Sequence, residues 1–113
     1  MAPQGRFLSM ASSKEYLRFI LEQLSGLDEI TYRVMMGEYI LYYREKIVGG
    51  IYDDRLLVKP VPAAISSMPI VSYDRPYEGA KEMLLVEYVD DREFLTKLFE
   101  AMYKELPAPK KKK

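Results

Sequence analysis

The feature that most limits how this chain can fold is a strand-rich segment with very short connections. From residue 31 the apolar residues alternate with a period of two, which predicts strands at Tyr32–Met36, Tyr39–Tyr43, Ile47–Tyr52 and Arg55–Lys59. The connections hold only two or three residues, and connections this short join antiparallel neighbours only. The segment therefore predicts an antiparallel meander.

These connections consist of residue types that favour turns. They are predicted at Gly37-Glu38, at residues 44–46 and at Asp53-Asp54. The two adjacent aspartates are also a candidate metal-binding or catalytic pair, but no other acidic cluster lies at a spacing that would complete such a site. We therefore interpret Gly37, Asp53 and Asp54 as structural turn residues.

A helix is predicted before the meander, in the segment SSKEYLRFILEQLSG. Ser12 and Glu15 fit a capping box, and Gly26 stands where a left-handed residue often ends a helix. Leu17, Ile20, Leu21 and Leu24 repeat at helical spacing and predict one buried stripe.

A less regular region follows the meander. Residues 60–80 contain four prolines, with a short helix possible between the first and the third. A fifth strand is predicted at Glu82–Val89, followed by a helix from about residue 91 to Leu106, with Asp90 as its N-cap and Glu93 reaching back.

Together these elements predict an α+β fold in two layers. An antiparallel sheet of about five strands carries the N- and C-terminal helices packed on it. We expect one domain at residues 12–106, a disordered leader at 1–11 and a disordered lysine tail at 107–113. The absence of Cys, of a signal peptide and of any apolar run of ~20 residues fits a cytoplasmic protein without a membrane span.

The missing residue types restrict the chemistry. The chain has no His and no Cys, which excludes Ser-His and Cys-His nucleophile pairs and the usual zinc sites. Any catalysis would have to use carboxylates, Lys or Tyr, and we predict no catalytic residue, no metal and no cofactor. Four of the 17 basic residues lie in the terminal lysine run, so the remaining chain is acidic overall, which disfavours nucleic acid as a partner.

Gly49 and Gly50 interrupt the third strand. Glycine inside a strand usually marks a bulge or the close approach of another group to the backbone. A helix crossing tightly over the sheet is the favoured explanation here, and a ligand approaching the backbone is the alternative.

Both faces of the predicted sheet are apolar. In Tyr39–Tyr43 the odd-numbered residues share one face and the even-numbered residues share the other. The second face is covered either by the chain itself or by a partner, and the sequence leaves both readings open. If a protein partner or a second copy binds there, the expected interface residues are Arg33, Tyr39, Tyr43 and Lys59.

The segment YRVMMGEYILYYREKIVGGIYDDRLLVKPV resembles the N-terminal domain of TfoX, the bacterial regulator of competence genes. The matching positions are Arg33, Met35, Met36, Gly37, Tyr39, Tyr42, Asp53, Asp54, Leu56 and Lys59. GAKEMLLVEYVDDREFLTKLFEAM resembles the last strand and helix of that family, so the resemblance covers about residues 14–104. Met36 and Glu38 depart from it, since the family often has an aromatic residue and a second glycine there.

The resemblance implies a stand-alone N-terminal domain with a secretion-chaperone-like fold, a class in which several members form homodimers. It implies a non-enzymatic role in transcription regulation, through contact with a regulator and not with DNA. Two alternatives come from the residues themselves. One is nucleic-acid stacking on Tyr39 and Tyr43 with the basic residues Arg33, Arg44, Arg55 and Lys59 around them. The other is an enzyme or small-ligand binder that holds an anion with Arg33, Lys59 and a tyrosine.

Overall fold

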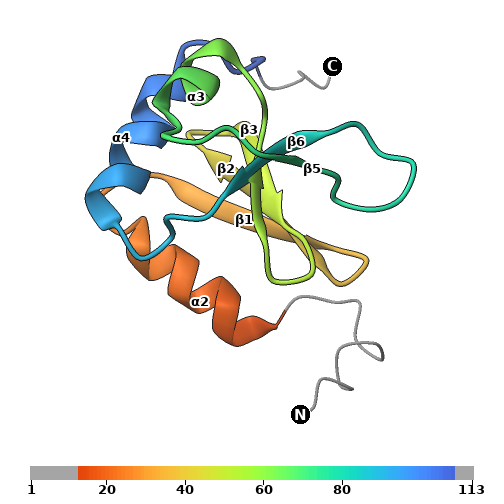
Figure 1. Ribbon diagram of the computed structural model, residues 1–113. Coiled ribbons are helices and arrows are strands. Elements are labelled where there is room, and N and C mark those ends of the chain that lie inside the picture. The colour runs from red at the N-terminus through yellow and green to blue at the C-terminus, as the bar shows by residue number, and fades with distance from the viewer. Residues whose placement is uncertain (1–12, 109–113) are drawn as a thin grey trace.

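The computed structural model describes residues 13–108, which form three helices and one sheet (Figure 1). The elements follow the order α2 (Lys14–Gln23), β1 (Ile30–Met35), β2 (Glu38–Tyr43), β3 (Lys46–Ile51), β4 (Leu56–Val58), α3 (Pro62–Ser67), β5 (Tyr73–Asp74), β6 (Met83–Val86) and α4 (Arg92–Tyr103). The expected leader and most of the expected lysine tail lie outside the described residues.

The strands form a 6-stranded sheet in the order β1-β2-β3-β4-β6-β5, and every neighbouring pair is antiparallel. The three helices lie along one side of this sheet in Figure 1. The prediction of a two-layer α+β fold is therefore confirmed, with one more strand than expected.

The three tight turns join β1 to β2, β2 to β3 and β3 to β4. Their central residues, Met36-Gly37, Arg44-Glu45 and Asp53-Asp54, all have positive φ. Positive φ at both central residues defines the two-residue turn whose twist matches a β-hairpin. The turn roles of Gly37, Asp53 and Asp54 are confirmed, but the first turn lies one residue earlier than predicted, and Glu38 belongs to β2.

The short strand β5 was not predicted. It pairs with β6 at the edge of the sheet, with Tyr73 opposite Leu84 and Asp74 opposite Met83. Two residues are too few to show a periodic pattern, and Pro76 argued against a longer strand. The predicted strand at Glu82–Val89 is present as the shorter β6, and the short helix in the proline-rich region is present as α3.

The N-terminal helix has different ends from those predicted. Ser13 is its N-cap, and the Ser13 hydroxyl accepts a hydrogen bond from the Tyr16 amide at 3.1 Å. Ser12 lies outside the described residues. Gly26 is not a left-handed cap, because its φ is not positive and the chain leaves the helix through Leu24 in tight turns closed by bonds such as Leu27 N to Leu24 O at 3.0 Å.

The C-terminal helix begins one residue later than predicted. Asp91, not Asp90, is the N-cap of α4, and its carboxylate accepts a hydrogen bond from the Phe94 amide at 3.0 Å. Asp90 is exposed in the preceding turn. Glu93 has an ion pair with Lys97, at 3.9 Å, in place of the expected contact with the cap.

The core lies between the helices and one face of the sheet. Phe99 of α4 and Ile20 of α2 are fully buried, as are Leu41, Ile51 and Leu56 on the sheet. The helical spacing of Ile20 predicts its burial, since an apolar stripe on a helix must cover an apolar sheet face.

Gly49 and Gly50 are crowded by strands and not by a helix, so the favoured explanation from the sequence is wrong. A Cβ on Gly49 would meet the Leu57 carbonyl and lie 2.6 Å from the Val58 Cα, and one on Gly50 would lie 2.6 Å from the Tyr39 carbonyl oxygen. The β2–β3 register also shifts between Leu41 and Tyr42. The prediction of a bulge or a close backbone approach is thus confirmed, and its cause lies within the sheet.

Candidate functional site

The sheet face that points away from the helices is the candidate site, and we call it the open face. One row of paired residues runs across it, from Arg33 through Ile40, Gly50 and Leu57 to Leu85. The neighbouring row, which contains Leu41, Val58 and Leu84, faces the core. The period of two therefore separates the two faces in β2 and β4, while the register shift interrupts it in β3.

Tyr39 and Tyr43 do not lie on the open face. Each is only 7% exposed and belongs to the core, and the Tyr43 ring packs edge-on against Tyr103 at 5.4 Å between centroids. Their expected place in an exposed interface is wrong, because they share the strand face of the buried Leu41. Of the expected interface residues, Arg33 is exposed and Lys59 is half-buried, and both lie on the open face.

Part of the open face is covered by the chain itself. Leu57 points away from the helix-side core, yet it is 0% exposed. Tyr52 is also buried, and its ring lies over Gly50, where an added Cβ would be 2.8 Å from the ring. Burial raises the pKa of the Tyr52 phenol, and the nearby Tyr77 and Glu38 raise it further. The chain itself therefore covers the open face at β3 and β4, which is one of the two possibilities that the sequence left open.

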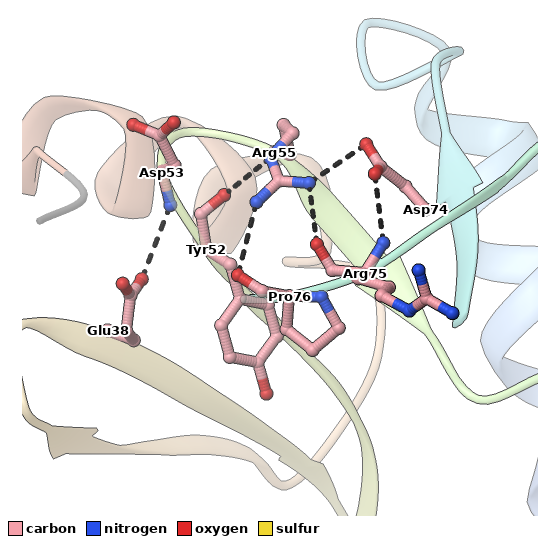
Figure 2. A network of polar contacts seen from close by, with 7 residues as sticks. All are labelled: Glu38, Tyr52, Asp53, Arg55, Asp74, Arg75 and Pro76. Carbon is pink, nitrogen blue, oxygen red and sulfur yellow. Dashed lines mark hydrogen bonds and ion pairs between the residues drawn. The ribbon is translucent and has the colours of Figure 1, made fainter. Parts of the chain in front are cut away.

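Arg55 holds the connection between β5 and β6 against this face. Its guanidinium donates hydrogen bonds to the carbonyls of Tyr52, Arg75 and Pro76, at 3.0, 3.0 and 3.3 Å, and to the Asp74 carboxylate at 2.9 Å (Figure 2). A planar guanidinium presents its donors in a fixed geometry, so one side chain ties four acceptors together. No pattern along the chain indicates this network, because Arg55 is distant in sequence from Asp74, Arg75 and Pro76.

The Asp74 carboxylate completes the network. It accepts a hydrogen bond from the Arg75 amide at 2.9 Å and forms an ion pair with Arg55. The Arg75 amide, and then the Arg55 guanidinium, lower the pKa of Asp74 below its ordinary value. At neutral pH this ion pair joins Arg55, which directly precedes β4, to Asp74, the last residue of β5. Residues 75–82 follow Asp74 and lead into β6.

Two hollows lie on the open face and share Tyr52 and Tyr77 in their walls. The larger has a volume of about 510 Å³, and its walls include Ile47, Tyr52, Lys59, Tyr77, Lys81 and Met83. The smaller has a volume of about 460 Å³, and its walls include Met35, Met36 and Ile40. The larger hollow combines apolar walls with two ammonium groups, of Lys59 and Lys81, and one carboxylate, of Glu105.

The aspartates of the β3–β4 turn have structural partners. An Asp54 carboxylate oxygen accepts a hydrogen bond from the Ser13 amide at 2.8 Å, and the Asp53 amide donates one to Glu38 at 3.3 Å (Figure 2). Within residues 13–108, no three acidic side chains gather in a way that could hold a metal ion. Over the same residues, no helix is long and apolar enough to cross a membrane.

The basic and aromatic residues expected to stack nucleic-acid bases are not assembled on one surface. Tyr39 and Tyr43 are buried, and Arg55 is engaged in its network. The Arg44 guanidinium lies 5.9 Å from the Tyr43 ring and 5.7 Å from the Tyr103 ring, at the end of the β2–β3 turn. The arrangement proposed from the sequence is therefore wrong in its geometry.

The fold and this face define a two-layer α+β protein with one sheet face closed by helices and the other partly open. The chain belongs to the same family as the uncharacterized 12.7 kDa protein in the trpE 5′ region of Spirochaeta aurantia, to which it is 32% identical over 105 residues, 92% of this chain and 91% of that protein. No family model and no solved structure matches the chain.

Proposed function

We propose that this protein is a non-enzymatic regulatory domain that acts through protein contacts, as the resemblance to the TfoX N-terminal domain suggests. The observation that carries the proposal is the open face, where exposed apolar side chains adjoin two hollows and a basic residue. Met35 is 53% exposed, with Arg33 two residues before it on the same face of β1, and Ile47 on β3 is 38% exposed. Surface patches of this composition are typical of protein-binding sites.

The partner that suits this face is an apolar segment with acidic residues beside it. Lys59 and Lys81 supply positive charge beside Ile47 and Met83, while the Glu105 carboxylate in the same wall accepts a hydrogen bond from the Ala63 amide. In our proposal the partner is a transcription regulator and binding takes place in the cytoplasm. The acidic balance of the chain without its lysine run supports a protein partner over a nucleic acid.

Affinity capture with paired surface variants tests the proposal. The combined substitution Arg33→Glu and Met35→Ser changes the open face, while Arg18→Glu and Ile70→Ser makes a similar change at exposed positions elsewhere. With the full chain as bait, we expect the open-face variant to recover a partner at least about tenfold less than wild type, a loss of ~1.4 kcal/mol or more in binding free energy. The control variant is expected to recover it normally.

Circular dichroism must show that both variants keep the wild-type fold. The same partner recovered equally by the open-face variant and by wild type contradicts the proposal, and so does the absence of any specific partner.

A further inference from the structure

The two edges of the sheet differ in how well they are protected. At one edge β5 has only two residues, and Pro76 follows shortly after it. At the other edge β1 has six residues, no proline, and an unbroken register with β2 from Ile30 opposite Tyr43 to Met35 opposite Glu38. Proteins usually shorten, bend or charge an open edge strand, because its free backbone groups pair readily with another strand.

The orientation of the β1 backbone shows which groups are available. The Arg44 amide donates to the Glu29 carbonyl at 2.9 Å, so residue 29 and every second residue after it point their backbone groups at β2. Ile30, Tyr32 and Val34 therefore point their N–H and C=O groups away from the sheet. In the part of the chain that the structure describes, no strand pairs with them.

We propose that β1 pairs with β1 of a second copy of this chain, antiparallel and about a two-fold axis at Tyr32. In this register Tyr32 lies opposite the partner's Tyr32, and Ile30 lies opposite the partner's Val34. Each outward N–H then meets an outward C=O, and the two sheets become one. The pairing also covers Tyr32, which is 43% exposed, and Val34, which is 66% exposed.

The position of the charged residue in β1 favours this register for pairing with a second copy of the chain. Arg33 is the only charged residue of β1, and the axis at Tyr32 places it opposite the partner's Thr31. An axis one residue further on, at Arg33, would place the two guanidinium groups directly opposite each other, which is unfavourable. The axis at Tyr32 avoids this repulsion, and β1 carries no proline or inward charge that would prevent the pairing.

Single cysteines test the register, since the natural chain contains none. Directly opposite residues of a hydrogen-bonded antiparallel pair have Cα atoms about 5.5 Å apart, within disulfide range. Under mild oxidation we expect Tyr32→Cys to form a covalent dimer at least about tenfold faster than Val34→Cys, whose side chain lies opposite the partner's residue 30. A mixture of Ile30→Cys and Val34→Cys chains is expected to cross-link rapidly, although each variant alone cross-links only slowly.

Sedimentation of variants without cysteine tests the dimer itself. The Val34 N–H points outward, so Val34→Pro removes a donor to the partner and leaves the β1–β2 ladder intact. Val34→Thr keeps that donor and serves as the matched control. We expect wild type and Val34→Thr to form dimers and Val34→Pro to be a monomer with an unchanged circular dichroism spectrum.

Wild-type chain that sediments as a monomer up to ~1 mM overturns the proposal, since that range spans weak association. Equal cross-linking of Tyr32→Cys and Val34→Cys also overturns it, because pairing would then have no fixed register. The first of these outcomes would also result if another part of the chain or a foreign strand occupied β1. The cross-linking and sedimentation tests need no partner protein, so they can overturn the dimer while the capture test still supports the open face.

Discussion

At the residue scale, the two glycines of β3 show how closely the strands approach one another. The atoms nearest to an added Gly49 Cβ belong to the backbone of β4, at Leu57 and Val58. Backbone inside a sheet cannot move aside as a flexible side chain can, because its position is set by the ladder of hydrogen bonds on both sides. Gly49 is therefore required by packing and not by φ.

We expect Gly49→Ala to lower the free energy of unfolding by about 3 kcal/mol, because its methyl group has no space against β4. Gly26→Ala is the matched control. Its Cβ would lie 3.8 Å from the Thr96 hydroxyl, an ordinary contact, so we expect a change within about 0.5 kcal/mol. Urea unfolding measures both. Similar stabilities for the two variants would show that β4 moves away freely.

The ion pair between Arg55 and Asp74 makes the stability of the folded protein depend on pH. The pKa of Asp74 is lowered in the folded protein, so its contribution to stability is full above the ordinary carboxyl pKa and is lost as the pH falls through the lowered value. The Asp74 side chain is 44% exposed, which limits the contribution to about 1 kcal/mol or less.

Asp74→Asn should therefore be less stable than wild type at neutral pH, and the difference should shrink as the pH falls below the ordinary carboxyl pKa. Urea unfolding over an acidic pH series measures this difference. Glu93→Gln removes a charge from the more exposed pair with Lys97 and is expected to have a smaller effect. A stability difference that stays constant across the series would exclude an electrostatic origin.

At the element scale, adjacent aspartates have different roles according to the position of the helix. Asp90 and Asp91 are chemically the same, but only the Asp91 carboxylate accepts a hydrogen bond from the Phe94 amide. A cap residue must stand where its side chain reaches the amides of the first helical turn. The packing of Leu95, Leu98 and Phe99 in the core determines where that turn begins.

We expect Asp91→Ala to destabilise the protein by about 1 kcal/mol, the usual value for loss of an N-cap. Asp90→Ala is the matched control and should change stability by less than about 0.5 kcal/mol, because Asp90 is exposed and lies outside the cap. Thermal unfolding followed by the helical signal in far-UV circular dichroism measures the stability of both variants. Larger destabilisation by Asp90→Ala would place the start of α4 one residue earlier.

At the scale of the whole molecule, the helices close one sheet face, while residues 75–82 and Tyr52 cover only part of the other. The remaining open face and the β1 edge meet at Arg33, which belongs to both. A partner on the face and a second copy at the edge would therefore lie next to each other. Binding at one place is then expected to influence binding at the other.

If β1 pairs between copies, stability depends on protein concentration. The urea midpoint of the wild-type chain is expected to rise with concentration, because association stabilises the folded state by mass action. Val34→Pro should show a midpoint that does not depend on concentration. Dichroism at several concentrations measures this, and a midpoint that stays constant for wild type would contradict the dimer.

The sequence by itself determined the meander, the apolar stripe of the N-terminal helix and the presence of two faces on each strand. These features are local, since the spacing of apolar residues and the length of a turn are read along the chain. It also limited the chemistry, because the residue types are known without a structure.

The tertiary structure alone decided which face of the sheet the helices cover, and so placed Tyr39 and Tyr43 in the core. Both faces are apolar in the sequence, and only packing against α2 and α4 distinguishes them. It also decided the Arg55 network and the partners of Gly49, because these contacts join residues that are distant along the chain. The periodic pattern of one strand does not indicate which other segment of the chain packs against it.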